Sequence, residues 1–194
     1  MKNGSRVSHR TGAVMALALA VGLTATAGAA VAKGQSKSLN GCYIPTKGFA
    51  ESTSVNPAEQ VGLYRIVLER ENWEALSGKE KKSTTRKLVM EGPFRGVITS
   101  PQPILLDHVL ADEERRGVVY TQGDDFMVTG VECEGGIISG IETLRPVLGT
   151  GRYENLLPGG TVQVEGSVNN CPGDPDFGTN DFEVVEGGGV LCFN

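Results

Sequence analysis

Short apolar runs, rich in β-branched residues and separated by turn-forming clusters, constrain this fold more than any other feature. Residues 104–148 read ILLDHVLADEERRGVVYTQGDDFMVTGVECEGGIISGIETLRPVL. Runs of this kind, spaced by about 8 to 12 residues, are typical of an antiparallel sandwich or barrel. No segment between them has the length of a helix, which argues against a parallel sheet built from βαβ units. The sequence therefore predicts an all-β fold.

Glycines inside the runs favour a closed barrel over an open sandwich. Gly117, Gly130, Gly140 and Gly166 fall within predicted strands, where glycine weakens a strand but permits the bending that closure requires. Residues 161–168 (TVQVEGSV) alternate as a further strand. The runs DFEVVEG and GVLCF flank three consecutive glycines, which predicts a final hairpin. We expect a single antiparallel β-barrel, with a sandwich as the alternative.

The first half of the chain has a weaker β pattern. Residues 33–60 contain few apolar positions, which predicts an irregular N-terminal arm. Residues 58–76 fit either a strand or a helix, and residues 77–87 (SGKEKKSTTRK) form a charged loop in this interpretation. We assign residues 33–87 to the arm with a first strand or helix and residues 88–194 to the barrel core, with 33–194 forming one domain.

Residues 1–32 have the order of a secretory signal peptide. Basic residues precede an apolar run from Ala13 to about Thr24, and an Ala-x-Ala cleavage site ends at Ala29 or Ala32. The run is shorter than the ~20 apolar residues of a membrane span, which argues against an uncleaved anchor. We expect a secreted or periplasmic protein that has no membrane association after cleavage.

The charge of the chain argues against a nucleic-acid partner. The formal net charge is −5, and removal of the basic residues of the signal peptide lowers it to about −8. An acidic protein repels nucleic acid and anionic lipid. The basic cluster between Lys79 and Lys87 is local and is typical of a solvated loop. The sequence contains no cofactor signature, and it leaves the oligomeric state open, a homo-oligomer included.

Four cysteines follow the signal peptide: Cys42, Cys133, Cys171 and Cys192. An even number in an exported chain indicates two disulfides. The absence of a C-x-x-C spacing argues against a zinc ribbon or a thioredoxin-like site. We prefer to pair Cys171 with Cys192, because they flank one Gly-rich segment, and Cys42 with Cys133. The other connectivities stay open.

The segment GTGRYENLLPGG, residues 149–160, is a candidate phosphate loop or a corner between strands. A dinucleotide-binding loop needs a third glycine where Glu154 stands, and a P-loop needs a following Gly-Lys-Ser/Thr. The segment therefore predicts a corner with Tyr153 turned inward. The order GTGRYENLLPGGTVQVEGSV resembles the Gly-x-Gly-(Arg/Lys)-(Tyr/Phe) corner and the following strand of the allene oxide cyclase and dirigent group of calycin-like β-barrels.

This resemblance covers about residues 88–194. It implies an eight-stranded antiparallel barrel with a lumen, in a protein that binds or cyclises a small apolar molecule. The matching residues Gly149, Gly151, Arg152 and Tyr153 carry over a corner and no catalytic group. The two expected disulfides and the long N-terminal arm depart from the plant members of the group.

The catalytic candidates are His108, Tyr120, Asp124 and Tyr153. His108 is the only histidine after the signal peptide, and alternation places it on the apolar face of ILLDHVLA. A lone histidine on such a face is more often structural than functional. A carboxylate buried beside an apolar ligand has a raised pKa and can act as a general acid. For Asp124, which follows Gly123, we nevertheless favour a solvated turn.

Asp174, Asp176 and Asn180 carry oxygen ligands at the spacing of a calcium loop. Calcium needs six to eight oxygens, and the glycine and glutamate of an EF-hand are replaced here by Thr179 and Val185. A surface loop of Pro, Gly and Asp explains the same residues, so we predict no metal there.

Two functions fit this sequence. The first is a secreted β-barrel that binds a small apolar or aromatic molecule, with the cyclase, isomerase or dirigent-like stereo-directing activity that the resemblance implies. The second is a non-enzymatic extracellular interaction or structural protein with a packed barrel. The volume of the lumen discriminates between them, because a pocket with His108 or Tyr120 in its wall favours the first and a lumen filled by side chains favours the second.

Overall fold

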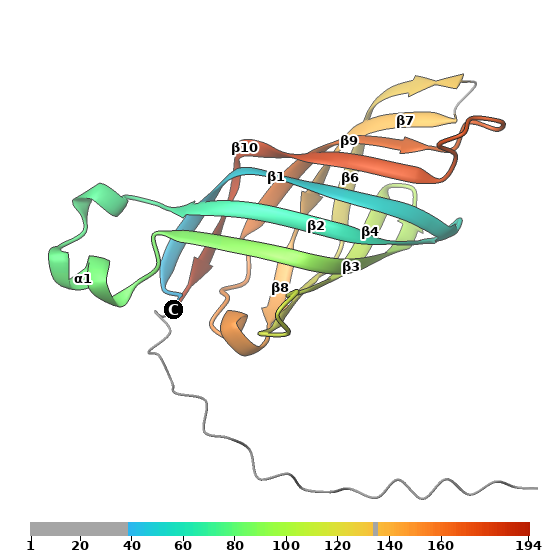
Figure 1. Cartoon of the computed structure of the whole chain (residues 1–194). Coiled ribbons are helices and arrows are strands. Elements are labelled where there is room, and N and C mark those ends of the chain that lie inside the picture. The colour runs from blue at the N-terminus through green and yellow to red at the C-terminus, as the bar shows by residue number, and fades with distance from the viewer. Residues whose placement is uncertain (1–38, 134–135) are drawn as a thin grey trace, which may run out of the picture. The chain divides into compact units, whose positions relative to one another are not determined.

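The computed structural model describes residues 39–133 and 136–194 and is all-β (Figure 1). The helical elements include η1 (Trp73–Ala75), α1 (Gly78–Ser83) and η3 (Gly151–Tyr153). No helix of the described residues is apolar and long enough to cross a membrane. The strands, in chain order, are β1 (Gly41–Asn56), β2 (Glu59–Arg70), β3 (Lys87–Pro101), β4 (Ile104–Ala111), β5 (Val118–Thr121), β6 (Asp124–Glu132), β7 (Ile137–Leu144), β8 (Pro146–Gly149), β9 (Thr161–Asn169) and β10 (Thr179–Phe193).

Eight of these strands close into an antiparallel barrel. The order around the barrel is β3-β2-β1-β10-β9-β7-β6-β4, and β4 pairs with β3 to complete the ring. β5 and β8 lie outside the ring, because β5 pairs with β4 and β8 pairs with β5. The prediction of an antiparallel β-barrel of about eight strands is confirmed.

The barrel begins earlier in the chain than predicted. β1 and β2 supply two of its strands, so the prediction of an irregular arm is wrong from Gly41 onward, and the core does not begin at residue 88. The ambiguous segment forms β2, in which Tyr64, Ile66 and Leu68 alternate along one face and are buried. The predicted signal peptide, residues 1–32, lies outside the described residues.

The charged segment between β2 and β3 contains a short helix rather than only a loop. The Ser77 side chain accepts a hydrogen bond from the backbone N–H of Glu80, and the Glu80 carboxylate accepts one from the backbone N–H of Ser77. This reciprocal capping box satisfies two N–H groups at the start of α1 and stabilises the turn.

The final two runs form one strand, β10, and not the predicted hairpin. Val184 pairs with Val164 of β9 and Gly189 pairs with Val162, so residues 185–188 bulge out opposite a single residue. Gly187 and Gly189 have φ of 71° and 117°. Side chains disfavour this backbone conformation, so the triple glycine permits a bulge within the strand.

The four cysteines form two disulfides, but the preferred pairing is wrong. Cys42 bonds to Cys192, and Cys133 bonds to Cys171. Cys42 and Cys192 stand directly opposite each other on β1 and β10. Cys133 follows β6 and Cys171 follows β9, and both strands flank β7. Strand register, which brings these residues together, therefore decides the pairing. Two disulfides fit an extracellular protein.

The lumen is packed by side chains from alternate positions of the strands. A Cβ atom on Gly140 would stand 2.5 Å from the ring of Phe126. Phe126 packs edge-to-face against Phe182, with ring centroids 6.0 Å apart. Gly140 thus leaves room for the aromatic packing and is more than a bending point. Further core residues are Tyr43, Tyr64, Ile66, Leu68, Leu88, Met90, Phe94, Leu106, Leu110, Leu144, Val162, Val164 and Leu191.

Candidate functional site

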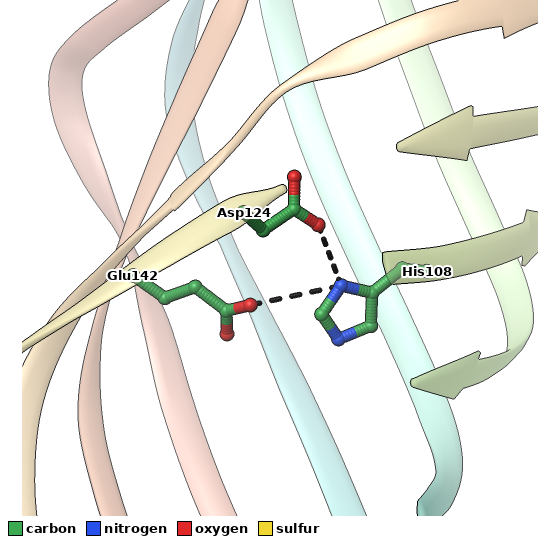
Figure 2. A group of neighbouring side chains, drawn as sticks. All are labelled: His108, Asp124 and Glu142. Atoms are coloured by element: carbon green, nitrogen blue, oxygen red, sulfur yellow. Dashed lines mark hydrogen bonds and ion pairs between the residues drawn. The ribbon is translucent and has the colours of Figure 1, made fainter. Parts of the chain in front are cut away.

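Three neighbouring strands place one histidine and two carboxyl groups in the lumen (Figure 2). His108 lies on β4, Asp124 is the first residue of β6, and Glu142 lies on β7. Their exposed fractions are 3%, 0% and 5%. The positions alternate with outward-facing residues, as a barrel strand requires. We call these three residues the lumenal cluster.

Short contacts hold the lumenal cluster together. His108 Nδ1 lies 2.7 Å from Asp124 Oδ2 and 3.6 Å from Glu142 Oε1. The first distance is that of a strong, charge-assisted hydrogen bond, and the second is too long for a hydrogen bond. Both carboxyl groups therefore approach the same ring nitrogen, and Asp124 forms the hydrogen bond with it.

Asp124 is fully hydrogen-bonded on both oxygens. Oδ1 accepts a hydrogen bond of 2.6 Å from the backbone N–H of Arg145, and Oδ2 accepts a further one from the hydroxyl of Thr121. The Thr121 oxygen in turn accepts from the backbone N–H of His108 at 2.9 Å. These bonds fix the carboxylate in the orientation that faces the imidazole.

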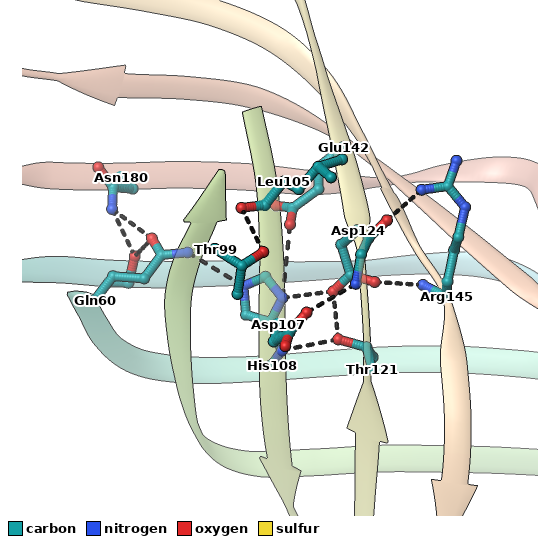
Figure 3. A network of polar contacts seen from close by, with 12 residues as sticks. Gln60, Thr99, Leu105, Asp107, His108, Thr121, Asp124, Glu142, Arg145 and Asn180 are labelled. Atoms are coloured by element: carbon teal, nitrogen blue, oxygen red, sulfur yellow. Dashed lines mark hydrogen bonds and ion pairs between the residues drawn. The ribbon is translucent and has the colours of Figure 1, made fainter. Parts of the chain in front are cut away.

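A row of amides holds the other side of the imidazole (Figure 3). His108 Nε2 lies 3.2 Å from Gln60 Nε2. The Gln60 oxygen accepts hydrogen bonds from Asn180 Nδ2 at 2.7 Å and from Ser52 Oγ at 2.9 Å. In the neutral form of the ring, Nδ1–H donates to Asp124 and Nε2 accepts from Gln60.

Glu142 is the incompletely bonded member of the cluster. Among the described residues, its Oε1 has no hydrogen-bond partner although it is buried. Burial raises the pKa of Glu142 to about 7, against a lowering effect of His108 and with a further rise from Asp124. The carboxyl group therefore gains and loses its proton near neutral pH.

The pKa of His108 is also raised. Burial alone lowers it, but the hydrogen bond with Asp124 and the charges of Glu142, Asp124 and Asp107 together outweigh burial. A buried histidine between carboxylates favours its charged form. The cluster can thus hold a proton, exchange one with a bound molecule, or bind a cation.

A small cavity adjoins the cluster. Its volume is about 30 Å³, which accommodates one or two water molecules. His108, Glu142, Ser52 and Gln60 supply its polar wall. The rest of the wall is apolar: Phe49, Ala50, Tyr64, Ile66, Phe94, Leu110, Leu144, Val164 and Phe182.

The barrel wall beside this cavity is interrupted. β1 and β10 pair at both ends, but the ladder has no pairs between Tyr43 and Phe49. Phe49, at the edge of the interruption, lines the cavity and is also 37% exposed. Its side chain therefore lies between the cavity and solvent, at the edge of the stretch in which β1 and β10 do not pair.

The four predicted catalytic candidates separate into two groups. His108 and Asp124 meet in the lumen, and the prediction that Asp124 belongs to a solvated turn is wrong because its side chain points inward from the first position of β6. Tyr120 lies on β5, outside the ring, and is 37% exposed. Tyr153 is buried in a second polar cluster.

That second cluster is centred on Asp112. The carboxylate accepts hydrogen bonds from Arg116 at 3.0 and 3.2 Å, and from the hydroxyl of Tyr153 at 2.9 Å. The Arg152 guanidinium lies 3.5 Å from the same carboxylate and stacks over the Tyr153 ring. Burial raises the pKa of Asp112, but the hydrogen bonds outweigh it and lower the pKa. We call these residues the Asp112 cluster.

The calcium candidates do not share a site. Asn180 is buried in the lumen, where its amide bonds to Ser52 and Gln60. Asp174 instead accepts a hydrogen bond from the backbone N–H of Asp176 and closes its own turn. The surface-loop interpretation explains Asp174 and Asp176, as a short side chain bonding to the backbone two residues on does in many turns.

Sequence reasoning missed Glu142 and Gln60. Glu142 carried one usable signal, since it stands two residues from Leu144 and two from Gly140 on one face of a strand. A charged residue on the lumen-facing side of an apolar strand is costly unless it is paired or hydrogen-bonded, so its presence there indicates a buried polar site. The sequence did not indicate that Gln60 faces the lumen, because its segment fitted either a strand or a helix.

Comparison with known proteins gives no match: no family model, curated protein or solved structure resembles this chain significantly. The site must therefore be interpreted from its own geometry.

Proposed function

We propose that this barrel is a secreted or periplasmic protein that binds a small apolar or aromatic molecule in its lumen and acts on it through the lumenal cluster. The observation that carries the proposal is an apolar cavity that ends in buried, convergent polar groups with raised pKa values. Such a combination is typical of a small-molecule site. Isomerisation or cyclisation suits a cluster that can move a proton.

Entry of such a molecule requires the cavity to widen. A volume of about 30 Å³ is below the ~300 Å³ of the smallest usual ligand pockets. Phe49 supplies the means, because it lies between the cavity and solvent at the edge of the stretch in which β1 and β10 are not paired. Rotation of its ring outward opens the cavity without breaking a backbone hydrogen bond of the β1–β10 ladder.

Uptake of an environment-sensitive apolar dye tests the proposal. We expect saturable binding, with weaker binding when Leu144→Gln places an amide in the apolar wall. Leu63→Gln is the matched control, because Leu63 is exposed on β2. Native mass spectrometry of the protein from its own host, before and after organic extraction, then identifies the molecule. No dye binding and no extractable mass would contradict the proposal.

A second candidate function is favoured by the small cavity itself. A lumen filled by side chains fits a non-enzymatic extracellular protein whose outer surface makes the contacts. In that case the dye fails to bind, and a partner is recovered by cross-linking on the native cell surface.

The predicted signal peptide supports the proposed location. N-terminal sequencing of the exported protein is expected to find its first residue after Ala32 or Ala29. Retention of residues 1–32 in the exported form would contradict this part of the proposal.

A further inference from the structure

We propose that His108, Asp124 and Glu142 bind a divalent transition-metal ion, with Zn²⁺ as the preferred ion. The ligand-type atoms of these three side chains lie within 4.8 Å of one another, and all three residues are buried. The inference deepens the proposed function by naming what the lumenal cluster holds. Only the use of the ion in catalysis rests on that function, since the site itself needs no organic ligand.

The unpartnered oxygen of Glu142 is the independent observation that supports the site. Oε1 is buried, has no hydrogen bond within the described part of the chain, and points at the imidazole nitrogen that Asp124 also faces (Figure 2). A buried carboxylate oxygen without a partner is costly. A cation between the three side chains removes this cost, because it gives each carboxylate an oppositely charged neighbour.

The spacing of the donor atoms suits one ion. The separations of 2.7 and 3.6 Å from His108 Nδ1 to the two carboxylate oxygens compare with a separation of about 3.3 to 3.6 Å between tetrahedral ligands that each lie about 2.0 to 2.2 Å from zinc. The ion displaces the proton that Nδ1 shares with Asp124.

The surrounding groups orient these ligands. Thr121 and the backbone N–H of Arg145 hold Asp124, and Gln60 contacts Nε2 of the imidazole. With Nδ1 on the ion, Nε2 carries the proton. It donates to the Gln60 oxygen once the amides of Gln60 and Asn180 both rotate, so that Asn180 Oδ1, which has no hydrogen-bond partner among the described residues, faces the Gln60 NH₂ group. Such outer contacts are regular features of metal sites, where they fix the ring and raise its basicity.

The donor set favours zinc over magnesium or calcium. An imidazole nitrogen suits Zn²⁺, Co²⁺ and similar ions, whereas Mg²⁺ and Ca²⁺ prefer oxygen ligands alone. Three protein ligands leave one position of a tetrahedral zinc ion to water. The adjoining cavity of about 30 Å³ accommodates that water. The open position therefore faces the cavity in which the proposed ligand binds.

Titration of the EDTA-treated protein with Zn²⁺, followed by calorimetry and by elemental analysis after gel filtration, tests the site. We expect one zinc per chain and no competition from a large excess of Mg²⁺. Co²⁺ is the second probe, and we expect it to give the visible absorption of a low-coordinate site.

Glu142→Gln is the informative variant, because it keeps the size of the side chain and removes a ligand charge. We expect it to weaken zinc binding at least about 100-fold and to abolish the Co²⁺ absorption. Glu165→Gln is the control, since Glu165 is exposed on the outer face of β9; its affinity should stay within about twofold of the parent.

Two results would overturn the proposal: no zinc bound by the parent protein, or equal zinc binding by the parent and by Glu142→Gln. The titration contains no organic molecule, so its outcome is separate from that of the dye experiment. Zinc binding without dye uptake would support the metal site and contradict the proposed function. Dye uptake without zinc binding would contradict only the metal site.

Discussion

The two buried polar clusters of this barrel differ in how completely their carboxylates are bonded. In the Asp112 cluster one carboxylate receives hydrogen bonds from Arg116 and Tyr153 and has two arginines as neighbours. In the lumenal cluster two carboxyl groups share one histidine, and Glu142 Oε1 receives no hydrogen bond from the described residues. In the first cluster two arginines approach one buried carboxylate, whereas in the second one histidine faces two buried carboxyl groups.

This difference separates a structural role from a functional one. A buried carboxylate with sufficient donors is held ionised, and it stabilises the corner that precedes β9. A buried carboxyl group without donors is destabilising, and such a group is typically retained for binding or catalysis. The opposite pKa shifts of Asp112 and Glu142 report the same contrast.

Asp112→Asn tests the structural half of the comparison and is expected to have the largest effect. The amide cannot pair with the arginines, and it places an NH₂ group against donors. We expect a loss of about 3 kcal/mol in the free energy of unfolding, measured by urea denaturation. A loss below about 1 kcal/mol would show that the cluster is not structural.

The pH dependence of the free energy of unfolding tests the role of the lumenal cluster. The folded-state pKa values of Glu142 and His108 lie above their unfolded values, so the folded protein binds more protons. Their stabilisation is fully present below the unfolded pKa values and is lost as the pH rises through the folded ones. We expect a fall of about 2 kcal/mol between pH 5 and pH 8 in EDTA.

The pKa shift of Asp112 has the opposite sign, and it affects stability in a separate, more acidic pH range. Its folded-state pKa is lowered, so its contribution is lost as the pH falls below the ordinary range of a carboxyl group. Urea midpoints at several pH values should thus be highest in mildly acidic solution. A flat profile between pH 5 and pH 8 would contradict the assignment of the lumenal cluster.

Glu142→Gln should stabilise the metal-free protein. It removes a carboxyl group that must ionise in a buried position, and the expected gain at pH 8 is about 1 to 2 kcal/mol. The gain should disappear at pH 5, where the parent carboxyl group is protonated. Thermal denaturation in EDTA at both pH values measures it; destabilisation at pH 8 would mean that the carboxylate is structural.

Tyr153→Phe gives the smallest expected effect. It removes the hydroxyl that donates to Asp112 and leaves the ring packed. Because the two arginines still hold the carboxylate, we expect a loss of only about 1 kcal/mol. A loss as large as that of Asp112→Asn would indicate that Tyr153, rather than the arginines, holds the corner together.

Local sequence patterns predicted the strand content and the orientation of some side chains. The alternation around His108 predicted that it shares a face with Leu106 and Leu110, and all three are buried. The glycines predicted closure of the sheet. The same kind of local reasoning was wrong for Asp124, since the turn at Gly123 ends one residue earlier than the pattern suggested.

Alternation along a strand is set by the backbone itself, so the sequence alone determined that His108 shares a face with Leu106 and Leu110 in an antiparallel β-fold. The tertiary structure decided that the sheet closes into a barrel and that this face points into its lumen. Register between strands depends on pairing across the whole sheet, and only the tertiary structure decided it. That register joined Cys42 to Cys192 and converted the triple glycine into a bulge. It also brought Glu142 of β7 close to His108 of β4. Local sequence patterns do not show such a contact, because the two residues are remote in sequence.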